Sequence, residues 1–66
     1  MCEFTVLKKG EVVFKDVVYA RSDGRKVTVR DVLGVSKTFE NCIVEEVDVK
    51  SERLVLVSYH RKSNVF

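Results

Sequence analysis

The thiol and imidazole groups of this chain, which suit transition metals and nucleophilic chemistry, are the side chains of Cys2, Cys42 and His60. The sequence holds no Cys-x-x-Cys or His-x-x-His pair, so a closed zinc site within one chain is not expected. A Cys–His catalytic pair would also need a third group that orients the histidine, and a domain this small rarely offers a deep apolar cleft. The chain is therefore expected to bind a ligand and not to be an enzyme.

Cys2 lies beside the free end of the chain, where a thiolate and backbone or terminal nitrogen atoms are neighbours. A thiolate is a soft, strong metal ligand, and nitrogen with sulfur in one plane suits Ni(II) or Cu(II). A second N-terminus related by a two-fold axis could bring another thiolate to the same ion. Both donors must lose protons to bind, so affinity should rise with pH through the neutral range. The alternative is that Cys2 begins the first strand and packs as a small apolar residue.

The other two candidates have simpler interpretations. Cys42 precedes an apolar pair and is expected to be a buried thiol, because free cysteine is among the most buried residue types. A role as a second metal ligand stays open for it. His60 is expected to be exposed near the end of a strand, with a role as a ligand or a partner contact as the alternative.

A loose cluster of basic residues surrounds an Asp-Gly turn signal, and two tyrosines could stack on bases beside it. The cluster consists of Arg21, Arg25, Lys26 and Arg30, and the aromatic residues are Tyr19 and Tyr59. Small barrels bind single-stranded nucleic acid with such cations and rings. The alternative is an ordinary solvated hairpin, and an acidic stretch farther along the chain would repel phosphate (Glu40, Glu45, Glu46, Asp48 and Glu52).

The elements that would position these residues are predicted to be strands. Valine and aromatic residues, which favour strands, fill the segments between three glycines. The expected segments are 2–8, 11–20 with a bend or bulge at Lys15-Asp16, 26–33, 35–39, 43–49 and 54–57. A short helical turn is possible at 31–35 or 38–42. The pattern predicts one all-β domain over 1–66, a small SH3-like or Sm-like barrel of about five to seven short strands.

The pattern of the last strands predicts which residues share a face. Ile43, Val47 and Val49 should lie together on one face of their segment. The run from Leu54 to Val57 is apolar on both faces, so the face with Val55 and Val57 is a candidate dimer interface.

Size and charge narrow the class of protein. A chain of 66 residues buries only about 60% of the surface of its unfolded form, so a metal or a second subunit is expected to add stability. Two cysteines are too few for a secreted disulfide scaffold, and we expect a cytoplasmic protein with reduced thiols and no membrane segment. The net charge of +2 does not distinguish a nucleic-acid-binding protein from other small proteins.

Several of these features together resemble a known family. They are the Met1-Cys2 start, Lys9-Gly10, the run Phe14-Lys15-Asp16-Val17, the Asp-Gly turn, Leu33-Gly34, and the closing Val47-Asp48-Val49 and Leu54-Val55-Leu56. In these the chain is similar to the CooT-type family of small proteins, which has also been catalogued as predicted RNA-binding proteins. The resemblance runs from Met1 to about Val57.

The resemblance implies a small β-barrel homodimer that binds nickel as an accessory in the maturation of carbon monoxide dehydrogenase. It implies a metal site at the cysteine after the initiator methionine, which is Cys2 here. The chain departs from the expected pattern at Phe4, where a small residue is expected. Three hypotheses follow: a nickel-binding accessory homodimer, a nucleic-acid-binding module using the basic cluster, and a scaffold subunit without a ligand of its own.

Overall fold

The computed structural model describes residues 2–59, which form six β-strands and contain no helix. The strands are β1 (Phe4–Lys8), β2 (Glu11–Asp23), β3 (Lys26–Asp31), β4 (Ser36–Glu40), β5 (Cys42–Asp48) and β6 (Arg53–Ser58). This confirms the all-β prediction, and the reason is the high content of β-branched and aromatic residues in most of the strands. Within the described residues, no helix is available to cross a membrane.

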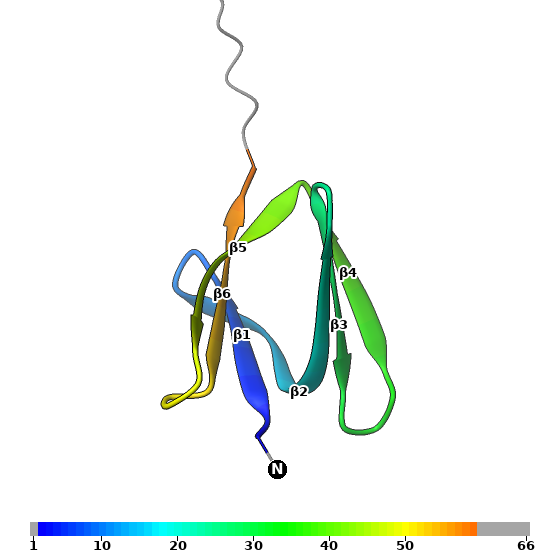
Figure 1. Cartoon of the computed structure of the whole chain (residues 1–66), viewed down its shortest axis with the longest axis vertical. Coiled ribbons are helices and arrows are strands. Elements are labelled where there is room, and N and C mark those ends of the chain that lie inside the picture. Colours follow the sequence, from blue (N-terminus) through cyan, green and yellow to red (C-terminus); the bar gives the residue numbers. More distant parts are fainter. Residues whose placement is uncertain (1, 60–66) are drawn as a thin grey trace, which may run out of the picture.

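The strands form a single sheet in the order β4-β3-β2-β1-β6-β5, in which only β1 and β6 run parallel (Figure 1). β2 is 13 residues long and bends at Asp16, whose φ is 58°. The register with β3 then shifts between Val17 and Tyr19. The bend predicted at Lys15-Asp16 is therefore confirmed, and it lets one strand pair with β1 in its first part and with β3 in its second.

The sheet is not closed into a barrel, so the expected SH3-like or Sm-like closure is not confirmed. Its two outer strands, β4 and β5, are joined by Asn41 alone, whose φ is 57°. A two-residue loop is the usual minimum for an antiparallel hairpin, so strands joined by one residue diverge instead of pairing. Beside this link, the Cys42 amide donates to the Arg25 carbonyl in the β2–β3 turn at 2.9 Å, and the Tyr59 amide donates to the Asn41 carbonyl at 2.7 Å.

The core fills the inside of the curved sheet. It consists of the buried residues Val6, Val17, Val27, Val29, Leu54 and Leu56, with Phe4, Val13, Phe14, Phe39 and Val44 packed against them. Each buried valine or leucine contributes about 1.5–3 kcal/mol by leaving water. Leu54 and Leu56 face inward, whereas Val57 is 36% exposed, so the predicted alternation of β6 is confirmed.

The molecule has two different ends, visible in Figure 1. At the closed end, the β2–β3 turn, Asn41 and the last residues of β6 come together. At the open end lie the start of β1, the bend of β2, the β3–β4 turn and the β5–β6 turn. Neither segment proposed for a helical turn is helical: 32–35 is a turn, and 38–42 is extended except at Asn41.

Candidate metal site

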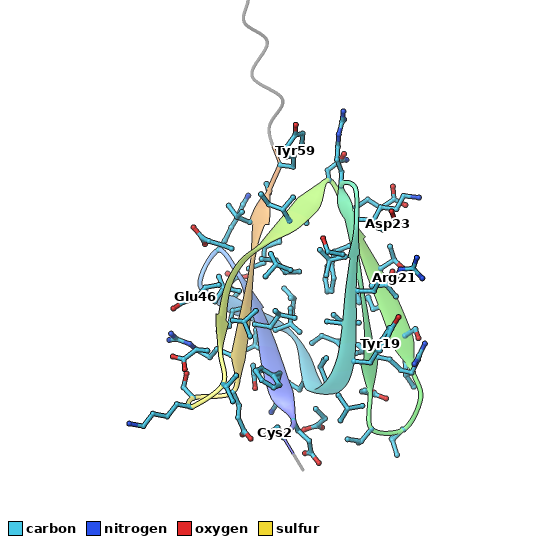
Figure 2. The ribbon with its side chains drawn as sticks, viewed as in Figure 1. Cys2, Tyr19, Arg21, Asp23, Glu46 and Tyr59 are labelled. Atoms are coloured by element: carbon cyan, nitrogen blue, oxygen red, sulfur yellow. The ribbon has the colours of Figure 1, made fainter. Side chains whose placement is uncertain are left out.

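Cys2 is exposed and lies at the open end, just before β1 (Figure 2). The strand that follows is anchored, because the Thr5 amide donates to the Glu52 carbonyl at 2.8 Å and Phe4 pairs with Val17. The thiol is therefore held two residues from the first paired position of the sheet and remains open to solvent. An exposed thiol has the donor chemistry that a soft divalent metal needs.

Within residues 2–59, no group of three or more cysteine, histidine or carboxylate side chains gathers as a metal site would require. Met1 and His60 lie outside the described residues. The structure thus places one candidate sulfur ligand at the open end, and the predicted role of His60 stays a prediction.

Cys42 has the buried position that the sequence predicted. Its side chain is fully buried at the closed end, and its Sγ donates to the Glu40 carbonyl at 3.3 Å. The two sulfur atoms therefore belong to opposite ends of the molecule, and Cys42 does not join Cys2 in a common site. Its surroundings are those of a structural core thiol.

The basic cluster is brought together only in part. Arg21, Lys26 and Arg30 share the outer face of the β2–β3 pair. In β3 the side chains of Val27 and Val29 are buried, so Lys26, Thr28 and Arg30 point outward, and Arg21 of β2 stands directly opposite Thr28. Lys26 stands directly opposite the carboxylates Asp23 and Glu40. Figure 2 shows Tyr19, Arg21 and Asp23 following one another along β2.

The tyrosines of this region already stack on the chain's own cations. The Arg30 guanidinium lies 4.4 Å from the centre of the Tyr19 ring and its Nε donates to Ser36 Oγ at 3.3 Å. Arg25 lies in the β2–β3 turn, with its guanidinium 5.1 Å from the centre of the Tyr59 ring. These contacts and the opposed carboxylates are those of a solvated sheet surface, and binding of nucleic acid stays a prediction.

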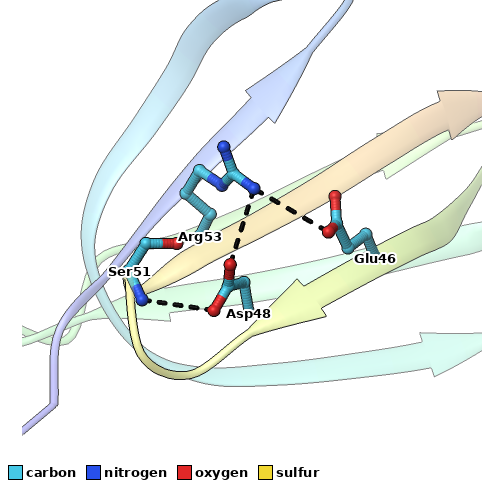
Figure 3. Close-up of polar contacts among 4 residues, drawn as sticks. All are labelled: Glu46, Asp48, Ser51 and Arg53. Atoms are coloured by element: carbon cyan, nitrogen blue, oxygen red, sulfur yellow. Dashed lines mark hydrogen bonds and ion pairs between the residues drawn. The ribbon is translucent and has the colours of Figure 1, made fainter.

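Part of the acidic stretch has a structural role at the β5–β6 turn (Figure 3). The Arg53 guanidinium lies 3.7 Å from the Glu46 carboxylate and 3.6 Å from that of Asp48. Asp48 Oδ1 also accepts a hydrogen bond of 3.2 Å from the Ser51 amide. Hydrogen bonding by the Ser51 side chain, then by its amide, and the charge of Arg53 lower the pKa of Asp48 below its ordinary value of 3.8.

An apolar cavity of about 190 Å³ lies toward the open end. Its walls include Phe4 at the start of β1, Val18 and Ala20 of β2, Val47 of β5 and Leu54 of β6. Sequence reasoning missed this cavity because its walls come from four strands whose adjacency no local pattern reveals. It also missed the role of Asp31 in the β3–β4 turn, where Asp31 Oδ1 accepts hydrogen bonds of 2.9 Å from the amides of Leu33 and Val35. Aspartate at the first position of a turn is a recognisable signal for such a role.

Comparison with known proteins assigns the family. The chain matches the family model described as CO dehydrogenase accessory protein CooT over residues 1–57. That span includes Cys2 and all but the last residue of the six strands. A search of curated proteins finds no match. The family match covers well over half of the chain, and the chain therefore belongs to the CooT family of CO dehydrogenase accessory proteins.

Proposed function

We propose that this chain is a cytoplasmic accessory protein that binds nickel through Cys2 in a homodimer and serves the maturation of a metalloenzyme. The observation that carries the proposal is the exposed thiol of Cys2 within a family match that begins at residue 1. The family supplies the accessory role with carbon monoxide dehydrogenase as the recipient, and the thiol supplies the donor chemistry. In this role the chain catalyses no reaction of its own.

The chemistry of the donors explains why a chain end is suitable. A thiolate with a neighbouring nitrogen atom forms a chelate ring, and a planar set of nitrogen and sulfur donors favours Ni(II). One chain offers one such sulfur, so a second chain related by a two-fold axis would double the set. An exposed position lets the ion enter and leave, which a carrier requires.

The test is an isothermal titration with Ni(II), in which wild type is compared with Cys2→Ser and Cys42→Ala. We expect the Cys2→Ser variant to lose binding, because the hydroxyl oxygen is a poor ligand for this metal. Cys42→Ala is the matched control, since its sulfur is buried at the other end of the molecule and should leave the titration unchanged. Nickel binding by Cys2→Ser equal to that of wild type would refute the proposal.

Proton release gives a second measurement on the same variants. The thiol must lose its proton to bind, so the affinity of wild type should increase from pH 6 to pH 8, by about tenfold for each proton released per pH unit. Titrations in buffers of different ionisation enthalpy count those protons. A pH-independent affinity would show that a deprotonating donor such as Cys2 is not involved.

A further inference from the structure

β4 forms one edge of the sheet, and among residues 2–59 no strand pairs with its outer side (Figure 1). Its ladder with β3 is regular over the whole strand, from Ser36 to Glu40. The other edge strand, β5, is interrupted by the register shift between Val44 and Glu46. A bulge on an edge strand disrupts pairing with a further strand, whereas a regular strand is a template for it. β4 is therefore the edge better suited to accept another strand.

The hydrogen bonds to β3 use the backbone of every second residue of β4. The Asp31 amide donates to the Val35 carbonyl at 2.9 Å, which identifies a hydrogen-bonded pair. Such pairs alternate with non-hydrogen-bonded pairs in an antiparallel ladder, so Lys37 and Phe39 also bond to β3. The amides of the intervening residues point away from β3 toward the free edge, and they belong to Ser36, Thr38 and Glu40.

Lys37 gives this edge a preference for negative charge. It stands opposite the fully buried Val29, so its side chain extends over the inner face of the sheet, with Nζ 5.3 Å from the centre of the Phe39 ring. Both ion pairs among the described residues involve Arg53, so Lys37 has no carboxylate partner there. An inward-pointing lysine on an edge strand opposes pairing with a uniformly apolar strand, and a carboxylate directly across the ladder is favourable.

We infer that β4 binds an extended segment of another protein, which joins the sheet as an antiparallel strand and places a carboxylate opposite Lys37. Antiparallel pairing is the more stable arrangement per residue. Lys37 and Phe39 would occupy non-hydrogen-bonded positions of the new ladder, where facing side chains are closest. The segment would therefore carry an acidic residue opposite Lys37 and, two positions away, an apolar residue opposite the half-buried Phe39. Backbone bonds would supply the affinity, and these two side chains the specificity.

A second copy of this chain is a poor occupant of the same edge. If two β4 strands paired about a two-fold axis through Thr38, both Lys37 side chains would lie on one face of a short ladder. Glu40 lies on the other face of β4, so that face would hold no carboxylate to offset the two charges. The inference goes beyond the proposed function, because the edge of β4 involves neither Cys2 nor a bound metal.

The first test uses the synthetic peptide acetyl-Thr-Val-Thr-Glu-Thr-amide, whose glutamate falls opposite Lys37 when its valine falls opposite Phe39. Amide hydrogen exchange of the isotope-labelled chain is followed by NMR at millimolar peptide. At a peptide concentration ten times the Kd, exchange at the three edge amides should slow by about tenfold. The amides of Lys37 and Phe39 already bond to β3 and should not change. This alternation distinguishes strand addition from contact with side chains alone.

The second test reverses the charge at the centre of the site. Lys37→Glu should weaken binding of the glutamate peptide by roughly tenfold, because attraction across the ladder becomes repulsion. The same variant should prefer a peptide with lysine in place of the glutamate. Lys15→Glu is the matched control, since it makes the same charge change at an exposed lysine in the bend of β2 and should bind like wild type.

The third test removes one donor from the free edge. Thr38→Pro has no amide hydrogen at this position, and proline is tolerated on an edge strand where the amide faces solvent. The variant should lose peptide binding while the amides of Lys37 and Phe39 keep their slow exchange, which shows that the ladder with β3 is intact. If Thr38→Pro does not fold, the result for Lys37→Glu decides.

Four results would overturn the inference. They are unchanged exchange at the edge amides with millimolar peptide, equal slowing along the whole of β4, undiminished binding of the glutamate peptide by Lys37→Glu, and protection of the edge amides in wild type alone that grows with protein concentration. The last result would mean that a second copy occupies the edge. Failure of the metal proposal has a separate readout, since it would appear as nickel binding by Cys2→Ser whether or not the peptide binds.

Discussion

The two ends of the sheet differ in how the chain closes them, and each end holds one of the two cysteines. At the closed end a single residue, Asn41, links β4 to β5, and backbone hydrogen bonds to Arg25 and from Tyr59 hold the strands together. At the open end, Asp31 and Asp48 accept hydrogen bonds from backbone amides of their own turns, and Leu33 and Val49 of these turns are exposed. The short link therefore holds one end of the sheet together, whereas separate turns form the other end.

The same contrast applies to the thiols. Cys42 is fully buried at the closed end and donates to a carbonyl, whereas Cys2 is exposed at the open end. Thiol chemistry depends on access as well as on residue type. Position in the fold, and not the residue itself, separates a structural cysteine from a candidate ligand.

The largest effect is expected in the core that both ends share. Leu56→Ala should lower the free energy of unfolding by about 2–5 kcal/mol, because Leu56 is 1% exposed and its removal leaves a cavity. Urea denaturation at fixed protein concentration measures the change. Val57→Ala, the neighbour that faces outward, is the control and should cost less than about 1 kcal/mol. Equal losses for the two variants would mean that the inward and outward faces of β6 are misassigned.

The closed end depends on the backbone conformation of Asn41. Asn41→Val should destabilise the protein by about 1–2 kcal/mol, because a β-branched residue is strained at a φ of 57°. Asn41→Gly should be nearly neutral, since glycine adopts this conformation freely. Thermal unfolding of both variants measures the difference, and a valine variant as stable as the glycine variant would contradict the role of this link.

The open end depends on Asp31 for the shape of its β3–β4 turn. Asp31→Ala removes the acceptor of two amide hydrogen bonds and should cost about 1 kcal/mol. Asp31→Asn keeps an acceptor oxygen at the same place and should retain most of the stability. Hydrogen exchange of the Leu33 and Val35 amides gives the local readout: it should accelerate in the alanine variant, and unchanged exchange there would rule out the side-chain contacts.

The smallest effect is the pH dependence that Asp48 contributes at the β5–β6 turn. Its pKa is lowered in the folded protein, by hydrogen bonds from Ser51 first and also by Arg53, so the folded state favours the ionised carboxylate. The stabilisation is present above its ordinary pKa of 3.8 and is lost as the pH falls toward the lower folded value. Stability of wild type relative to Asp48→Asn should therefore decrease between pH 5 and pH 3. If the difference in stability between wild type and Asp48→Asn stays constant over this range, Asp48 is not the source of the pH dependence.

The strands and the main irregularity of the fold were predictable from local pattern. The content of valine and aromatic residues located most of the strands, and the charged pair Lys15-Asp16 marked the bend of β2. The burial of Cys42 followed from its apolar neighbours in the same way. Each of these features depends on residues that are adjacent along the chain, which is why sequence alone could reveal it.

The prediction for β5 was wrong, and the reason shows what a local sequence pattern cannot reveal. Ile43 and Val47 were expected to share a face, but the register shifts between Val44 and Glu46. Ile43 therefore stands opposite the outward Val57, and Val47 opposite the inward Leu54. One extra residue in a bulge exchanges the faces of every residue after it, and simple alternation does not reveal such a residue.

Residue composition and spacing were sufficient for the class of fold and for most strands, and the family resemblance added the choice of Cys2 as the candidate ligand. Only the folded chain decided that the sheet stays open, that Cys2 and Cys42 lie at opposite ends, and that an apolar cavity forms between β1, β2, β5 and β6. The physical reason is how far apart along the sequence the interacting residues lie. Strand formation depends on neighbouring side chains, whereas closure of the sheet, cavities and shared surfaces depend on the pairing of segments that are distant along the chain.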